Sequence, residues 1–281
     1  MGPRKIQPAW RVLAISGAAA LAILAGEALA DDEKPATASS VTTQQSKIRV
    51  AIIVGGHGYD QKPFPAMFEA MKDVEFVIRT AQEPDKPHLF DDPNNFPYDV
   101  IFLYNMSNKL TAAQGENFLK LLDKGVGLFV CHHAICGFQD WPGWPDLIGA
   151  RYFLKEEMFR GEKGVRSIWK DDVDLKMHVE DANHPITRGL KDYDTCDETY
   201  GKWRFLPGNV LLVSTEHPLS NKQIAWVRPQ GSRRVFVLQA GHGPLAWNNP
   251  AFRHLLGQGI RWAARRLDGK DKEKKVIGPR S

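Results

Sequence analysis

Short apolar segments alternate with amphipathic segments in the first half of this chain, and this alternation limits its fold more than any other feature. The apolar runs are rich in β-branched residues, which is typical of buried strands, and the segments between them have helical spacing. The strands are expected at residues 48–54, 75–80, 98–104 and 126–131, and the helices at 63–72 and 111–122. Because parallel strands joined by helices are covered on both faces, the pattern predicts an α/β fold with a doubly wound sheet.

The second half of the chain is less regular but continues the same domain. Strands are expected at residues 165–169, 175–179, 210–214, 224–227 and 234–238, and a closing amphipathic helix at 250–266. No internal repeat and no linker interrupts this part of the sequence. We therefore predict a single folded domain over residues 47–267.

The first 30 residues have the features of a secretory signal peptide. Arg4, Lys5 and Arg11 precede an apolar run at residues 12–26, which ends near a small-x-small site at residues 28–30. This arrangement predicts cleavage after Ala30 and a periplasmic or secreted protein with no stable membrane insertion. An uncleaved membrane anchor is the alternative, although the run is shorter than the roughly 20 residues of a typical span.

Two polar segments flank the predicted domain. Residues 31–46 are rich in Thr, Ser, Ala and Gln and are expected to be a disordered tether, and residues 268–281 are expected to be a charged, disordered tail. Removing residues 1–30 leaves 34 Lys and Arg against 32 Asp and Glu, a net charge of +2. With no basic stripe in the domain, nucleic-acid binding is not expected.

The chain has three cysteines, an odd number for an exported protein. Cys131 lies in an apolar strand, where a buried thiol is the usual role. Cys136 and Cys196 are able to form one disulfide, and the sequence leaves this open.

Histidines and other polar residues cluster where the predicted strands end. His57 follows the first strand, Asn105 the third, His132 and His133 the fourth, and His242 the last. Ligands of open α/β sheets bind beyond the carboxyl ends of the strands, so these side chains are expected around one crevice. His57 and Asn105 would contact a substrate there.

His132 and His133 are adjacent, so on an extended strand their side chains would point to opposite sides. One would face the crevice as a general base, a general acid or a metal ligand, and the other would pack beneath it or contact substrate. A purely structural role is the alternative for each.

Asp197, Glu198 and Tyr200 form a second polar group. If this segment is a strand, Glu198 and Tyr200 share a face. The group, Asp197 included, would bind sugar hydroxyls or complete a metal site; a turn capped by Asp197 is the alternative. The predicted metal ligands are His132, His242 and Asp197, with Glu198 as a catalytic group. Trp141 and Trp247 are candidate platforms for sugar rings, or else cover hydrophobic edges.

Several of these segments, taken in order, resemble the ThuA-like (trehalose utilisation) family. The resemblance rests on residues 127–132 (GLFVCH), Trp141, 147–149 (LIG), 184–187 (HPIT), Gly189, 197–200 (DETY), 234–236 (RVF), 241–242 (GH), Trp247, 250–252 (PAF) and 262–264 (WAA). It implies a flavodoxin-like fold of the class I glutamine amidotransferase type, and it places His132 in the crevice. It also implies carbohydrate metabolism, with oxidised (3-keto) glycosides among the substrates.

Two departures from related patterns matter. Residues 152–158 lack the His-Pro pair that many members carry there, and the turn after residue 131 carries His132 where amidotransferases carry a nucleophilic cysteine. Glutamine hydrolysis is therefore not expected. The glycine-rich turn at residues 55–59 lacks the Lys and Ser/Thr of a phosphate loop, so no nucleotide cofactor is expected.

Together these observations predict an exported enzyme that hydrolyses or isomerises a keto-disaccharide or glycoside. It would use His132, His242 and Glu198 in acid–base chemistry or with a divalent metal. A non-catalytic carbohydrate-binding or sensing protein on the same fold is the alternative. The expected partner is a small carbohydrate, and assembly into a homo-oligomer is left open.

Overall fold

The structure, a computed structural model, describes residues 46–80, 88–106 and 109–267. These residues lie in one compact unit, Gln45–Ser281. The predicted signal peptide, nearly all of the tether and the predicted tail lie outside the described residues. Within the described ranges, no helix is both long and apolar enough to cross a membrane.

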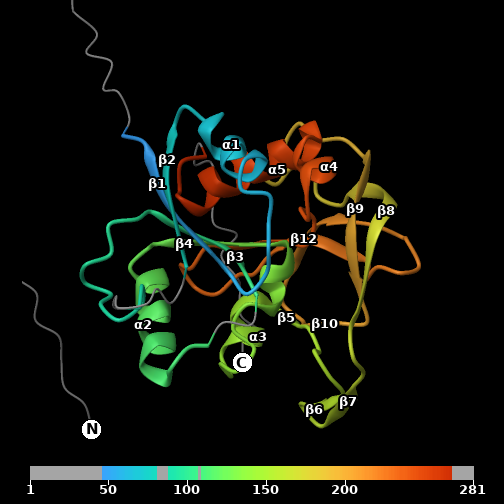
Figure 1. The fold of residues 1–281 in the computed structure, drawn as a ribbon, viewed down its shortest axis with the longest axis horizontal. Helices are drawn as coiled ribbons and strands as arrows, with labels where there is room; N and C mark the ends of the chain where they lie inside the picture. The colour runs from blue at the N-terminus through green and yellow to red at the C-terminus, as the bar shows by residue number, and fades with distance from the viewer. Residues whose placement is uncertain (1–45, 81–87, 107–108, 268–281) are drawn as a thin grey trace, which may run out of the picture. The chain divides into compact units, whose positions relative to one another are not determined.

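Five parallel strands form the first part of a nine-stranded sheet (Figure 1). In spatial order they are β2 (Val74–Thr80), β1 (Ile48–Gly55), β3 (Val100–Asn105), β4 (Gly127–Cys131) and β13 (Val235–Leu238). Numbered along the chain as five strands, this is the order 2-1-3-4-5 of a flavodoxin-like sheet. The doubly wound α/β fold expected from the sequence is confirmed.

Four antiparallel strands extend this sheet beyond β13. They are β12 (Gln223–Val227), β11 (Val210–Ser214), β8 (Ile168–Val179) and β9 (Tyr193–Gly201). The two strands expected at 165–169 and 175–179 were wrong as separate elements, because one long strand, β8, begins at Ile168 and runs through Val179. Two small sheets pair β5 (Ala150–Arg151) with β10 (Arg204–Phe205), and β6 (Glu157–Phe159) with β7 (Glu162–Gly164).

Helices cover both faces of the parallel strands. Figure 1 shows α1 (Pro63–Glu69), α4 (Pro244–Trp247) and α5 (Pro250–Ala263) on one face, and α2 (Ala112–Asp123) and α3 (Trp144–Ile148) on the other. At the start of α2, Thr111 accepts a hydrogen bond from the Gln114 amide, and the Gln114 side chain accepts one from the Thr111 amide. This reciprocal cap explains why the helix begins where the sequence predicted.

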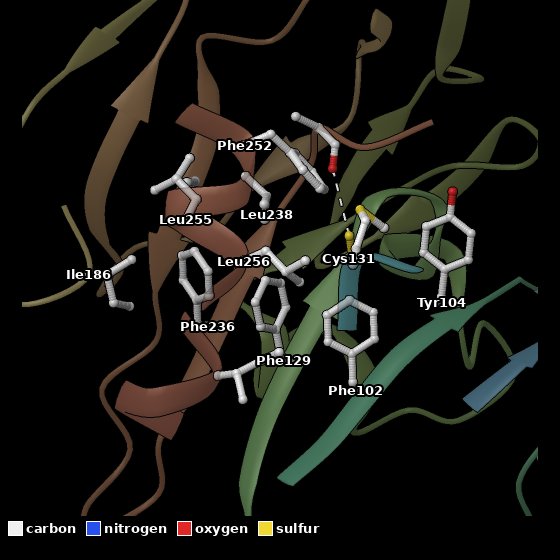
Figure 2. Close-up of a cluster of buried hydrophobic side chains, with 14 of the residues drawn as sticks. Phe102, Tyr104, Phe129, Cys131, Ile186, Phe236, Leu238, Phe252, Leu255 and Leu256 are labelled. Carbon is white, nitrogen blue, oxygen red and sulfur yellow. Dashed lines mark hydrogen bonds between the residues drawn. The ribbon is translucent and has the colours of Figure 1, made fainter. Parts of the chain in front are cut away.

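The sheet separates two hydrophobic cores. Side chains alternate along β1, so Val50 and Ile52 pack with α1 and α5, whereas Ala51 and Ile53 pack with α2 and α3. Figure 2 shows the first core, in which phenylalanines of the strands meet α5. The labelled core residues are Phe102, Tyr104, Phe129, Cys131, Ile186, Phe236, Leu238, Phe252, Leu255 and Leu256.

All three cysteines are free thiols, so the disulfide left open between Cys136 and Cys196 is not formed. Cys131 lies in the first core, with Sγ 3.7 Å from the carbonyl oxygen of Ala240 (Figure 2). Burial raises the pKa of both the Cys131 and the Cys136 thiol well above the ordinary value. Neither thiol is therefore prepared to act as a nucleophile at neutral pH.

Candidate functional site

The site begins at the sharp turn that follows β4. The chain leaves β4 at Cys131 and enters a short 3-10 helix, η1 (His132–Cys136), and His132 has a φ of 55°. A non-glycine residue with positive φ stores backbone strain and often marks a functional position. The expectation that His132 and His133 lie on an extended strand was wrong, since both belong to this turn.

His132 is fully buried, and both of its ring nitrogens are engaged. Nδ1 lies 2.9 Å from the carbonyl oxygen of Gln239, which can only accept, so Nδ1 carries the proton. Nε2 lies 2.9 Å from Glu198 Oε2, 3.2 Å from His242 Nδ1 and 2.9 Å from the Tyr200 hydroxyl. The turn after β4 therefore directs one imidazole nitrogen into a cluster of polar atoms.

Glu198 and Tyr200 reach this cluster from β9. The segment is a strand, so the two side chains share a face as expected, and the Tyr200 hydroxyl donates to Glu198 Oε2 at 2.6 Å. Burial alone would raise the pKa of Glu198, but hydrogen bonds from His132 and His242 hold this pKa far below its usual value. Glu198 is therefore an ionised carboxylate at neutral pH.

His242 enters the cluster from the loop after β13. Its Nδ1 lies 3.1 Å from Glu198 Oε2, and its Nε2 lies 3.9 Å from Asp171 Oδ1. The hydrogen bond to Glu198 raises the pKa of His242 against the opposing effect of partial burial.

Asp197 holds the His242 loop in place instead of pointing into the cluster. Its carboxylate accepts hydrogen bonds from the amides of Gly241 at 2.6 Å, His242 at 2.9 Å and Glu198 at 2.9 Å. The predicted metal ligand Asp197 is therefore replaced by Glu198. The physical reason is that consecutive residues of a strand point to opposite faces of the sheet, and Glu198 points to the face on which His132 lies.

Two aromatic side chains complete the clamp on this loop. The Tyr104 hydroxyl and the Trp247 indole both donate to the carbonyl oxygen of Gly241, each at 2.8 Å. Gly241 has a φ of 120°, and a Cβ there would lie 2.7 Å from the Phe252 ring. A glycine is required at this position for conformation and for space.

The three ligand atoms of His132, Glu198 and His242 are suited to one metal ion. They lie within 4.8 Å of one another, and two imidazoles with one carboxylate are a donor set that holds Zn²⁺ or Fe²⁺ in proteins. Ligands about 2.05 Å from one ion lie about 2.9–3.4 Å apart in octahedral or tetrahedral geometry. The observed separations of 2.9, 3.1 and 3.2 Å fit that range.

A pocket of about 240 Å³ lies beside this cluster. Its lining residues are His57, Met106, His133, Cys136, Tyr152, Trp169, Asp171, Glu198, Tyr200 and His242. These residues come from the ends of the parallel strands, from η1, from the β8–β9 ribbon and, for Tyr152, from the segment after β5. The crevice expected at the carboxyl ends of the strands is thus formed by the two halves of the chain together.

His57 and His133 line the same pocket, with ring centroids 4.6 Å apart and ring planes tilted by 32°. His133 Nε2 lies 3.2 Å from the Tyr104 carbonyl oxygen, so Nε2 carries the proton and Nδ1 is an acceptor. Burial, together with the neighbouring His132 and His57, lowers the pKa of His133 to about 2. His133 is a neutral imidazole at physiological pH.

Besides Asp197, three predicted binding residues lie outside the pocket lining. Trp141 is 8% exposed and packs in the second core, and Trp247 is 1% exposed in the first core. The predicted sugar platforms are therefore structural, because each ring fills space in the core. Asn105 is also fully buried at the end of β3, and its neighbour Met106 lines the pocket in its place.

A protein-family model matches most of this chain. The family model for ThuA, described as trehalose utilisation, matches residues 49–263, which include every residue of the cluster. The chain belongs to the ThuA family.

Solved structures of ThuA-like proteins have the same fold. One from Parabacteroides merdae is 17% identical, with a TM-score of 0.65, covering 80% of this chain and 93% of that one. Another, from Bacteroides uniformis, is 18% identical, with a TM-score of 0.56, covering 78% and 92%. No curated protein matches the chain.

Sequence reasoning missed five residues that line the pocket of this ThuA domain: Met106, Cys136, Tyr152, Trp169 and Asp171. For Trp169 and Asp171 the sequence carried a usable signal. Both lie on β8, and Trp169 is 58% exposed. The available signal was the alternation of the segment itself, since residues two apart on a strand share a face. That signal was hidden because residues 165–169 were treated as the whole strand.

Proposed function

We propose that this ThuA-family chain is a divalent-cation-dependent enzyme that hydrolyses or isomerises a carbohydrate, a keto-disaccharide or a glycoside. The observation that carries the proposal is the convergence of His132 Nε2, His242 Nδ1 and Glu198 Oε2 beside a pocket. Trehalose utilisation, the description of the family, supports a carbohydrate as the substrate class.

The surroundings of the three ligands support a metal site. The Gln239 carbonyl accepts the Nδ1 proton of His132, so Nε2 is the nitrogen that faces the cluster, where a cation would displace the proton that Nε2 donates to Glu198. Asp171 lies near the outer nitrogen of His242. Such outer contacts orient metal-binding histidines and raise their basicity. A cation held by these residues acts as a Lewis acid that polarises a substrate carbonyl or activates water.

The chain's own groups define how a substrate would be handled. Tyr200 donates to Glu198 Oε2 and thereby fixes the orientation of the carboxylate, and Asp197 fixes the backbone that carries His242. His133 is a buried neutral imidazole, and His57 packs against it in the pocket lining. Preorganised polar groups of this kind stabilise charge that develops in a transition state.

Export is part of the proposal. Residues 1–30 are proposed to direct the chain to the periplasm or the medium and to be removed after Ala30. A signal of this kind would place the enzyme where it meets sugars outside the cytoplasm.

The first experiment measures metal content and turnover together. Elemental analysis of untagged protein is expected to give about one transition metal per chain. Glu198→Gln should lose this metal, whereas Glu156→Gln, a change of an exposed glutamate, should keep it. Turnover of 3-keto-trehalose and 3-keto-glucosides, followed by mass spectrometry, separates hydrolysis from isomerisation.

The outcomes are distinct. If metal-free protein still turns over the substrate, the metal-dependent mechanism is wrong. Acid–base chemistry would then take its place, in which His132 removes the proton next to the carbonyl. Tight sugar binding with neither metal nor turnover would overturn the enzyme and favour a carbohydrate-binding or sensing protein.

A further inference from the structure

Strand β8 is irregular at the point where it passes the cluster. Trp169 pairs with Tyr200 and Lys170 with Thr199, but the next pair is Val173 with Asp197. Two residues of β8, Asp171 and Asp172, therefore oppose the single residue Glu198 of β9. This is a β-bulge, and bulges beside active sites redirect side chains.

The bulge sends its two aspartates to different sides of His242. Asp172 has a φ of 52° and lines a small hollow of about 100 Å³, together with His242 and Glu198. Asp171 lines the main pocket, where its Oδ1 is buried without a hydrogen-bond partner among the described residues. The bulge adds one residue to β8, so that Asp171 lines the pocket while β8 goes on pairing with β9 from Val173 onward.

Trp169 lies two residues before Asp171 and lines the same pocket. Its 58% exposure contrasts with that of Trp226, the tryptophan of β12, which is 0% exposed, and of Trp203, between β9 and β10, which is 4% exposed. An exposed aromatic face beside a carboxylate is suited to a ring with an apolar face and a hydroxylated edge.

The charged groups of the pocket are poorly suited to phosphorylated sugars. The lining includes the carboxylates of Asp171 and Glu198, and among the described lining residues there is no Lys or Arg. Phosphate and carboxylate groups are normally bound by Arg, Lys or backbone amides. Hydroxyl groups, in contrast, donate hydrogen bonds to carboxylates and imidazole acceptors.

The pocket is also small. About 240 Å³ is below the roughly 300–1,000 Å³ of pockets that bury drug-sized ligands, so it has room for about one sugar ring. A second ring of a disaccharide would extend toward the exposed Trp169.

From this arrangement we propose that Trp169 and Asp171, set by the bulge in β8, form an outer subsite for an uncharged sugar ring. This inference rests on the proposed function, because the inner ring is the one on which the proposed reaction takes place. Trp169 stacks on the outer ring, and Asp171 accepts hydrogen bonds from its hydroxyls. The subsite thereby selects neutral disaccharides over single sugars and over phosphorylated sugars.

Calorimetric titration of the metal-loaded wild-type chain tests this with three probes: trehalose, methyl α-glucoside and trehalose 6-phosphate. Trehalose should bind most tightly. Trp169→Ala should weaken trehalose binding about tenfold, because it removes about 55 Å² of apolar contact with the outer ring. The affinity for methyl α-glucoside, which has no outer ring, should not change. Trp169→Phe should restore most of the affinity, since it keeps an aromatic ring.

Asp171→Asn should weaken trehalose binding about fivefold, since a charge-assisted hydrogen bond becomes a neutral one. Asp174→Asn, an exposed aspartate on the same strand outside this pocket, is the matched control and should bind as the wild type does. Met158→Ala, a change of another exposed apolar side chain, is the control for Trp169→Ala.

Unchanged trehalose affinity in Trp169→Ala and Asp171→Asn would overturn the subsite, as would equal affinity for trehalose 6-phosphate. Metal content and keto-sugar turnover are measured on the same samples. If these fail while the affinity differences hold, the proposed reaction is wrong and the subsite stands.

Discussion

Replacing Gly241 with alanine is the sharpest test of how the His242 loop is held. Gly241 precedes His242, and its φ of 120° is one that L-residues rarely adopt. An added Cβ would lie 2.7 and 2.9 Å from two carbons of the Phe252 ring, where about 3.5–4.0 Å is optimal. Phe252 is 3% exposed in the first core, so its ring has little room to move (Figure 2).

The magnitude follows from two terms. The backbone strain costs about 1–3 kcal/mol, and overpacking a filled core costs about 1–3 kcal/mol. Gly241→Ala should therefore lower the free energy of unfolding by about 2–6 kcal/mol. For a domain of this size the Tm would fall by roughly 5–20 °C. If the loop shifts to relieve the clash, His242 moves with it, and metal affinity should fall about 10- to 100-fold.

Gly243→Ala is the matched control on the other side of His242. Gly243 has an extended φ of −160°, and no atom lies within 4 Å of its added Cβ. This variant should be unchanged or up to about 1 kcal/mol more stable. Thermal and urea unfolding, with metal titration, compare the two. The reasoning fails if both glycines tolerate alanine equally well.

Four further predictions follow from the site and its supports. Glu198→Gln should bind metal at least 100-fold more weakly than wild type in a chelator competition, because it removes the only charged ligand. His132→Ala should abolish turnover of 3-keto-trehalose while the protein stays folded by circular dichroism, and undiminished turnover would remove His132 from the mechanism. Asp73 forms a bidentate ion pair with Arg261, which lowers the Asp73 pKa; this pair is half-exposed and contributes at most about 1 kcal/mol. Its contribution is present above the unfolded pKa near 3.8 and is lost as the pH falls through the lower folded pKa. The stability of Asp73→Asn and wild type to urea should therefore differ at pH 7, and the difference should shrink as the pH falls below 3.8. Amino-terminal sequencing of exported protein should begin at Asp31, and an intact Met1 in the mature protein would contradict cleavage.

Local sequence patterns were sufficient for the parallel half of the fold. The apolar runs of β1, β3 and β4 and the Thr111 cap of α2 depend on neighbours in the chain, so propensity and periodicity predict them. The antiparallel extension was harder to predict. The length of β8 depends on its pairing with β9 and on the bulge at Asp172, which the sequence shows only as consecutive charged residues.

The candidate site was also predictable only in part. His57, His132 and His242 were predictable because parallel strands bring their carboxyl ends to one edge whatever the side chains are. The choice of Glu198 over Asp197 was not, since it depends on which face of β9 turns toward His132. The burial of Trp141 and Trp247, and the exposure of Trp169, also depend on packing between segments far apart in the chain.

The sequence by itself determined that the chain has a flavodoxin-like α/β domain of the ThuA family with histidines at the strand ends, because local periodicity and segment order are written along the chain. Only the tertiary structure decided that His132, Glu198 and His242 meet within 3.2 Å, and that Asp197 supports their loop instead. These contacts join residues 44 to 110 positions apart, and the twist and bulge of the β8–β9 ribbon set them. No local rule specifies that geometry, because it is fixed by the packing of the whole sheet.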